Sequence, residues 1–284
     1  MSKRHESKAQ QRATRTGNKQ RLGNWVRKGI LLALWGTLAS TALSAHADAL
    51  SDIKDSGVLK VAVPQDFPPF GSVGPDLKPR GYDIDMARYL ADEMDVKLEL
   101  VPVTSANRIP YLQTRKVDLV ISSLGKNPER EKAIDFSDAY APFFLGVFGE
   151  KGSEVDSAQG LSEKTIGVTR GSVEDMELSK VAPESTTVKR FEDNNTTLSA
   201  FLSGQVEMIA TGNLVTAAIA ERNPARVPVS VLPLKNSPCY VGMRHDSPAL
   251  KARVNELIAQ GIEDGTLNTL SETWFKAPLP SLDA

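Results

Sequence analysis

The sequence has very few of the residues on which metal sites and disulfides depend. It contains one cysteine, Cys239, and three histidines among 284 residues. One cysteine cannot form an internal disulfide, and a His/Cys zinc site needs about four such ligands, or three and a water. Outside residues 1–47, only Cys239 and His245 remain. The sequence therefore predicts no metal site.

Nucleophilic catalysis is excluded on similar grounds. A Ser-His-Asp triad would have to use His245, which lies in a polar segment, residues 243–248, that reads as a turn after a strand. Nothing resembles a phosphate-binding P-loop. We therefore predict no catalytic residue and no cofactor.

Long apolar runs are also scarce, and the single one lies near the N-terminus. Residues 1–28 are polar and basic, residues 29–45 carry no charge, and Ala45-His46-Ala47 follows. This order is typical of a cleaved Sec signal peptide. A membrane anchor is the alternative, but a spanning helix needs about 20 strongly apolar residues, and this run is rich in Ser, Thr and Gly. We predict that residues 1–47 are a signal peptide of an exported, soluble protein.

The remaining 237 residues are acidic. Residues 1–47 hold nine of the 34 Lys and Arg but only one of the 35 Asp and Glu, so the rest has a net charge near −9. Such a chain repels a polyanion, which excludes nucleic acid as a partner. Its length suits one large domain or two of about 100 residues each.

Strand-like runs alternate with helix-like segments, and the alternation occurs twice. This order predicts mostly parallel sheets covered on both faces, and hence an α/β chain with two lobes. Asp83 is the expected N-cap of the first helix. The expected strands are Val58–Val63, Val96–Val101, Val117–Ser122, Thr165–Val168, Thr187–Phe191, Val206–Ala210, Val227–Leu232 and Cys239–Met243; the expected helices are Ile84–Leu90, Arg108–Lys116, Val173–Val181, Asn195–Ser203, Leu214–Glu221 and Ala249–Phe275, the last with a break near Gly265.

Two apolar strands are the expected crossings between the lobes. We take these to be Leu145–Gly149 and Cys239–Met243, which would form a hinge. The first lobe would then comprise residues 48–147 and 243–284, and the second lobe residues 148–242.

Four segments rich in Ser, Thr, Gly and Arg follow predicted strands. They are residues 104–108, 122–130, 169–172 and 211–213. In open α/β sheets ligands bind at the carboxyl ends of strands, where helix N-termini favour anions. Each segment alone is more often structural, but four in two lobes indicate a binding site. Arg108 and Arg130 indicate one or two anionic groups on the ligand.

The chain resembles a known family through a set of motifs at fixed spacing. These are Pro69-Phe70, Gly81-Tyr-Asp-Ile-Asp85, Val117-Asp-Leu119, Ser122-Ser-Leu124, Glu129-Arg130, Phe136-Ser137 and Trp274-Phe275. They are similar to the periplasmic polar-amino-acid-binding proteins of ABC importers, the family-3 extracellular solute-binding proteins, over essentially the whole chain after residue 47. Residues 104–110 are similar to the glutamate/aspartate-binding branch.

The resemblance implies a type II Venus-flytrap fold with a ligand between the lobes. It implies that Arg130 clamps an α-carboxylate with Ser123, Gly125 and Ser172, that Phe67 stacks on the ligand, and that Ser105, Arg108, Thr169 and Asn194 face its other end. The full predicted set is Phe67, Ser105, Arg108, Ser122, Ser123, Gly125, Arg130, Thr169, Gly171, Ser172, Asn194 and Asn213.

Two departures from the family leave the ligand open. The family usually has an Asp for the ligand's ammonium where Gly212 stands here, and the glutamate/aspartate branch has an Arg near Pro64, where none occurs. A buried ammonium needs acceptors. Asn213, Asp193 or a backbone carbonyl could serve, or the ligand has no free α-amino group.

Three functions follow from the resemblance. The leading one is a solute-binding component that delivers an amino acid or related carboxylate to an ABC permease in the inner membrane, in the periplasm and as a monomer. The alternatives are a dehydratase-type enzyme on the same fold, which would need a positioned acid, and a module that presents its ligand to a membrane sensor.

N-terminal sequencing tests the interpretation of residues 1–47. We expect the exported protein to begin at Asp48, and retention of residues 30–45 would contradict cleavage. The basic region is unusually long, so translation could begin at Val26, read from a GTG codon. Sequencing the unprocessed precursor checks that start.

Overall fold

The computed structural model describes residues 48–153, 155–223 and 225–282, which lie within one compact unit, His46–Ala284. The predicted signal peptide lies outside these residues. None of the helices in the described ranges is both long and apolar enough to cross a membrane.

The first lobe is built on a five-stranded sheet of order β5-β1-β6-β13-β7. Strands β5 and β6 run parallel to β1, and β13 runs antiparallel to both β6 and β7. The strands are β1 (Val58–Val63), β5 (Lys97–Pro102), β6 (Leu119–Val120), β7 (Asp135–Ala141) and β13 (Cys239–Met243). One late strand therefore returns from the C-terminal part of the chain to complete this sheet.

The second lobe repeats that pattern with the order β10-β9-β11-β8-β12. Here β10 and β11 run parallel to β9, and β8 runs antiparallel to both β11 and β12. The strands are β8 (Phe144–Gly149), β9 (Thr165–Thr169), β10 (Thr187–Phe191), β11 (Met208–Gly212) and β12 (Val229–Asn236). The predicted class, a two-lobed α/β fold, matches this arrangement.

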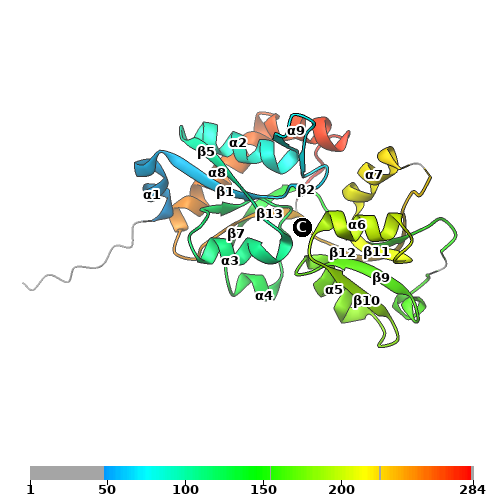
Figure 1. Cartoon of the computed structure of the whole chain (residues 1–284). Coiled ribbons are helices and arrows are strands. Elements are labelled where there is room, and N and C mark those ends of the chain that lie inside the picture. The colour runs from blue at the N-terminus through cyan, green and yellow to red at the C-terminus, as the bar shows by residue number, and fades with distance from the viewer. Residues whose placement is uncertain (1–47, 154, 224, 283–284) are drawn as a thin grey trace, which may run out of the picture. The chain divides into compact units, whose positions relative to one another are not determined.

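Successive strand residues point to opposite faces of a sheet. Apolar residues therefore lie on both faces of each sheet, and helices cover both. Leu59, Val61 and Val63 of β1 pack into a core with α2 and α8, whereas Ala62 packs with Leu112 of α3. Figure 1 shows α2 and α9 on one side of this sheet and α3 on the other. The helices of the first lobe are α1 (Ala49–Ser56), α2 (Tyr82–Glu93), α3 (Arg108–Gln113), α4 (Pro128–Glu131), α8 (Pro248–Glu263) and α9 (Thr266–Phe275).

The second sheet follows the same alternation. Ile209 of β11 packs toward the side of α6 (Asn194–Leu202) and α7 (Asn213–Arg222), and its neighbour Met208 packs toward α5 (Val173–Val181). Short 3-10 helices, η1 (Ser105–Asn107) and η2 (Ala158–Leu161), complete the helical elements in the described ranges. Each lobe thus has an apolar core on both faces of its sheet.

Most of the predicted elements are present, and several have the predicted bounds. Helix α5 and strands β1, β10 and β13 match residue for residue, and the long C-terminal helix breaks at Gly265, whose φ is 82°. Between β1 and α2, where no strand was predicted, the chain forms a small antiparallel sheet of β2 (Asp66–Phe67), β3 (Gly71–Val73) and β4 (Pro79–Arg80). These strands have two or three residues each, too few for an apolar alternation to be visible.

The predicted crossing strands do not cross between the lobes. β8 pairs only within the second sheet and β13 only within the first. The chain therefore passes between the sheets at residues 142–143 and 237–238. Because both strands are apolar and buried, their composition could not distinguish a hinge strand from a sheet strand.

The sequence suggested that Asp83 is the N-cap of α2, and the structure shows that it is not. The helix begins at Tyr82, two residues before the predicted start at Ile84, and its N-cap is Gly81 with φ 141°. A Cβ at Gly81 would lie 2.2 Å from the Phe70 carbonyl oxygen, so only glycine fits there. The Asp83 carboxylate is fully buried instead. Its Oδ1 accepts from the Tyr140 hydroxyl at 2.6 Å, and its Oδ2 accepts from the Ser123 N–H at 2.7 Å.

Burial of Asp83 predicts a stability that depends on pH. Burial raises the pKa of this carboxyl to about 7 in the fold, against the opposing hydrogen bonds from Tyr140 and Ser123. The unfolded chain loses its proton near pH 4 and the folded chain near pH 7. The contribution is therefore complete below about pH 4 and declines as pH rises toward 7, by at most about 1.4 kcal/mol per pH unit.

We expect the free energy of unfolding of the wild type, minus that of Asp83→Asn, to fall between pH 4 and pH 7. Denaturant titrations at several pH values measure this difference. Asp85→Asn, two residues along α2 with a half-exposed side chain, controls for loss of a carboxylate. A difference that rises over this range would contradict the account.

Candidate ligand-binding site

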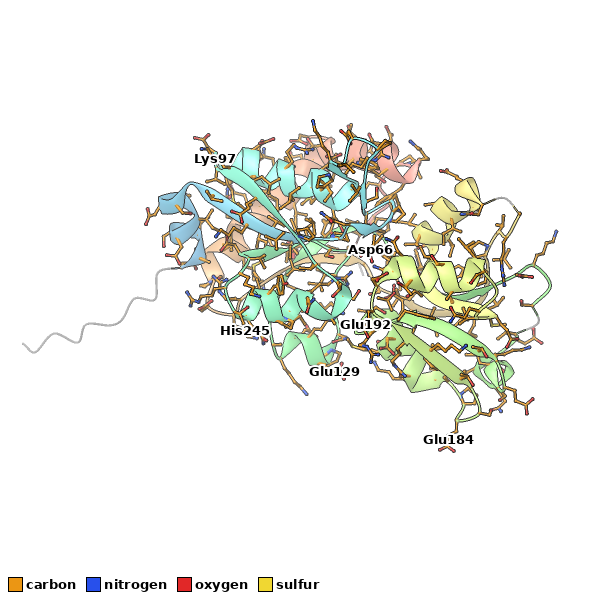
Figure 2. The ribbon with its side chains drawn as sticks, in the orientation of Figure 1. Asp66, Lys97, Glu129, Glu184, Glu192 and His245 are labelled. Carbon is orange, nitrogen blue, oxygen red and sulfur yellow. The ribbon has the colours of Figure 1, made fainter. Side chains whose placement is uncertain are left out.

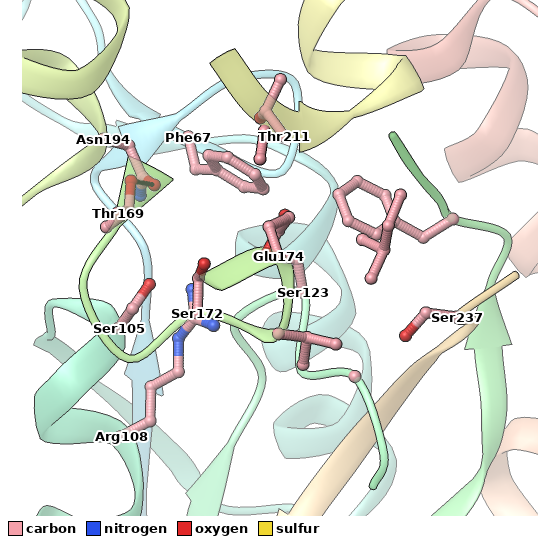
Figure 3. A pocket seen from close by; sticks show the side chains of 15 residues that line it. Phe67, Ser105, Arg108, Ser123, Thr169, Ser172, Glu174, Asn194, Thr211 and Ser237 are labelled. Atoms are coloured by element: carbon pink, nitrogen blue, oxygen red, sulfur yellow. Dashed lines mark hydrogen bonds between the residues drawn. The ribbon is translucent and has the colours of Figure 1, made fainter. Parts of the chain in front are cut away.

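A pocket lies where the two lobes meet, at the carboxyl ends of the parallel strands (Figure 3). Eight of the twelve predicted ligand-binding residues line it: Phe67, Ser105, Arg108, Ser123, Gly125, Thr169, Ser172 and Asn194. Seven further lining residues are outside the predicted set of twelve, although Thr211 lies in the predicted segment 211–213: Phe143, Leu145, Val173, Glu174, Ala210, Thr211 and Ser237. Both lobes contribute, so the pocket depends on how they come together.

Arg108 brings a positive charge to this pocket. It is the first residue of α3, is 4% exposed, and extends into the pocket in Figure 3. Its Nε donates to the Ser122 hydroxyl at 3.0 Å. Ser122 does not line the pocket, so it acts through Arg108 by holding the guanidinium in place. Burial lowers the pKa of Arg108, and the charges of Glu174, Asp66 and Asp83 oppose that change.

Arg130 is close to the pocket but does not line it. Asn127 caps the short helix α4 and accepts from the Arg130 backbone N–H at 2.8 Å. The guanidinium donates to the carbonyl of Gly125 at 2.7 Å and to that of Gly171 at 3.0 Å. In this structure Arg130 therefore ties the two lobes together, and its contact with a ligand carboxylate stays a prediction. Burial and the charge of Arg108 lower its pKa to about 9.

The last two predicted residues also lie outside the pocket lining. Gly171 has φ 72° and offers its carbonyl to Arg130. Asn213 opens α7, where its Oδ1 accepts from the Phe144 N–H at 3.1 Å. Asp193, the other suggested acceptor for an ammonium, caps α6 by accepting from the Thr196 N–H at 2.7 Å. Both candidate acceptors are thus already engaged with the backbone.

A second contact joins the lobes beside the pocket. Asp66 of β2 accepts from the Asn194 N–H at 2.7 Å and from its side-chain amide at 3.0 Å. Figure 2 labels Asp66 where the first lobe faces α6. Asn194 in turn accepts from the Thr169 hydroxyl at 2.8 Å. No sequence pattern pointed to Asp66, because a lone Asp in a loop is most often solvated.

Several polar groups at the pocket are free to bind a ligand. The buried hydroxyls of Ser123 and Ser237 have no hydrogen-bond partner among the described residues. Buried polar atoms are usually paired, so two such hydroxyls in one pocket indicate a polar ligand. Ser172, by contrast, caps α5 by accepting from the Asp175 N–H at 3.1 Å.

The lack of a side chain at position 212 is explained by Phe143, whose ring packs beside Gly212. A Cβ at Gly212 would lie 1.9 Å from the Phe143 Cζ. The ring is buried and packs against Phe67 and Phe70, at centroid distances of 6.1 Å and 5.3 Å. Phe143 therefore fills the space that a side chain at position 212 would need. Nothing local in the sequence connects these two positions.

Cys239 and His245 take no part in the pocket. Cys239 is buried in β13, and burial raises the pKa of its thiol. His245 lies on the outer surface of the first lobe (Figure 2), with its Nδ1 2.9 Å from the Asp135 carboxylate.

Comparisons with known proteins give a consistent result. Residues 59–277 match the family described as bacterial extracellular solute-binding proteins, family 3. The ABC transporter glutamine-binding protein of Bacillus subtilis (strain 168) is 28% identical, over 87% of this chain and 93% of that protein. A solved structure of an ancestral arginine-binding protein bound to arginine is 32% identical, with a TM-score of 0.73 over 77% of this chain and 98% of that one.

One further solved structure bears on the choice between binding and catalysis. It is the ancestral amino acid-binding protein described as a precursor of cyclohexadienyl dehydratase. It is 31% identical, with a TM-score of 0.74 over 80% of this chain and 99% of that one.

The packing of Phe143 on Gly212 predicts that a side chain at position 212 lowers stability. We expect Gly212→Ala to reduce the free energy of unfolding by about 1–3 kcal/mol, because the Phe143 ring must move within a packed core. Gly160→Ala is the control, since its nearest neighbour would lie at an ordinary 3.4 Å. Thermal and denaturant unfolding measure both variants, and equal effects would contradict the steric account.

Proposed function

Because the chain belongs to the bacterial extracellular solute-binding proteins of family 3, we propose that it binds a small carboxylate-bearing solute, an amino acid or close relative, between its lobes for an ABC importer. The relatives named above include proteins that bind glutamine and arginine. The ligand is held by this chain, and transport is driven by the importer's other subunits.

The observation that carries this proposal is the composition of the pocket. The Arg108 guanidinium provides charged donors, and the partnerless hydroxyls of Ser123 and Ser237 provide polar contacts. Arginine binds carboxylates through paired donors, and burial strengthens such contacts because water no longer screens them. Phe67, Phe143 and Leu145 supply the apolar walls.

The contacts between the lobes fit a closing motion. Asp66 binds Asn194, and Arg130 binds the Gly171 carbonyl. Within the described ranges the sheets are connected by two short segments, residues 142–143 and 237–238. A ligand that contacts both lobes favours the closed arrangement, which the permease would recognise.

The location and partners follow as parts of the same proposal. The signal-like residues 1–47 and the family support export to the periplasm, where a permease in the inner membrane would receive the ligand. We propose that the protein acts there as a monomer.

A dehydratase-type enzyme is the second candidate. It is favoured by an acidic side chain in the pocket, Glu174, and by the likeness to the dehydratase precursor. General acid catalysis needs a carboxyl group in such a position. Formation of product from prephenate or arogenate by the purified protein would support catalysis, and absence of turnover would leave binding.

A thermal-shift screen of refolded, ligand-stripped protein tests the proposal. A ligand that binds only the native state adds about 4 kcal/mol of stability at a thousandfold excess over Kd. We expect a large shift with at least one of L-glutamine, L-glutamate and L-arginine. We expect Arg108→Gln to weaken the binding of that amino acid by about a hundredfold, since a buried charge pair loses one partner.

Arg170→Gln is the matched control. Arg170 is half exposed, pairs with Glu192 at 2.8 Å and does not line the pocket. Calorimetric titration should give this variant the wild-type affinity. Equal affinity in Arg108→Gln and the wild type would contradict the role of Arg108, and no shift with any amino acid would contradict the ligand class.

A further inference from the structure

The lining of the pocket carries one charge of each sign. Arg108 is the basic residue, and Glu174 is the acidic one, among the described residues that line it. Glu174 is the second residue of α5, in the second lobe, and is 7% exposed. The two charges come from different lobes, so they face each other only when the lobes are together.

The Glu174 carboxylate forms no ion pair with a cationic side chain of the described residues. Within the described ranges, no Lys, Arg or His nitrogen lies within 4.0 Å of its carboxylate. Burial raises the pKa of Glu174, whereas its own backbone N–H, the charge of Arg108 and the Ser172 hydroxyl oppose that rise. A buried carboxylate without a cation is costly, and a cation brought by a ligand would relieve that cost.

Other carboxylates and amides near the pocket already have hydrogen-bond partners, and position 212 has no side chain. Asp66 binds Asn194, Asp193 caps α6, and Asn213 accepts from the Phe144 backbone. Position 212 is a glycine, and the Phe143 ring fills the space beside it that an acidic side chain would need. Among the described residues that line the pocket, Glu174 is therefore the one acid placed to meet a cationic group.

We propose that Glu174 accepts the ammonium group of the ligand while Arg108 receives its carboxylate, so that the site selects zwitterionic amino acids. This inference rests on the proposed function, because it assigns a ligand group within the same pocket. It places the ammonium site on α5 of the second lobe rather than at the end of β11. A ligand with both groups would bridge the lobes and favour closure.

The test compares amino acids with analogues that lack only the amino group. The probes are L-glutamine with glutaramic acid, L-glutamate with glutaric acid, and L-arginine with 5-guanidinopentanoic acid. Calorimetric titration gives the affinity of each probe for the wild type and for Glu174→Gln. Glutamine at position 174 keeps the shape of the side chain and removes its charge.

We expect the wild type to bind one amino acid at least about tenfold more tightly than its des-amino partner, as charge-assisted hydrogen bonds add affinity. In Glu174→Gln that ratio should fall to about one, because the amino acid loses affinity and its partner does not. Glu177→Gln, one turn along α5 and outside the pocket lining, should keep the wild-type ratio.

The outcomes separate this inference from the proposed function. If the wild type binds an amino acid and its des-amino partner equally, or if Glu174→Gln keeps the wild-type ratio, solute binding stands and the role of Glu174 is overturned. If neither the six probes nor any other amino acid binds, both are overturned. The wild-type ratio needs no variant, so equal affinities for an amino acid and its des-amino partner would overturn the inference even if Glu174→Gln does not fold.

Discussion

The buried carboxylate of Asp83 is the interaction on which the first lobe's half of the pocket depends. It joins three segments that are distant in sequence: the start of α2, the Tyr140 hydroxyl of β7, and the backbone of Ser123 after β6. Ser123 has φ 40°, an unusual conformation for a residue other than glycine. The hydrogen bond from its N–H to Asp83 stabilises that conformation, and so presents the Ser123 hydroxyl to the pocket.

The point where the chain passes between the lobes also shapes the pocket. Phe143 lies in the first crossing segment, and Ser237 lies in the second. One supplies an apolar wall that closes the space beside Gly212, and the other supplies a hydroxyl without a partner. Residues that connect the lobes therefore also determine what the pocket can hold. A change in the angle between the lobes would move both.

The sequence predicted the fold better than it predicted the contacts between lobes. Apolar alternation and the glycine at position 265 set the bounds of α5, β10, β13 and the C-terminal helices, since these depend on local preferences. Strand ends rich in Ser, Thr and Arg located the pocket, because parallel strands place their carboxyl ends together. Asp83 was wrongly predicted to be a helix N-cap. A buried aspartate that joins distant segments has the same local sequence pattern as an aspartate that caps a helix.

Two features of the site that the sequence analysis missed, the Phe143–Gly212 packing and Glu174, depend on a partner in the other lobe or far along the chain. Phe143 and Gly212 are 69 positions apart, and each is unremarkable until the ring is seen in the space beside the glycine. Glu174 follows the cap residue Ser172, where an acidic residue is favoured simply because it stabilises a helix N-terminus. Only its burial in a pocket opposite Arg108 distinguishes it from an ordinary first-turn glutamate. The charge that sets ligand class can therefore change position within a conserved fold while every local sequence rule remains satisfied.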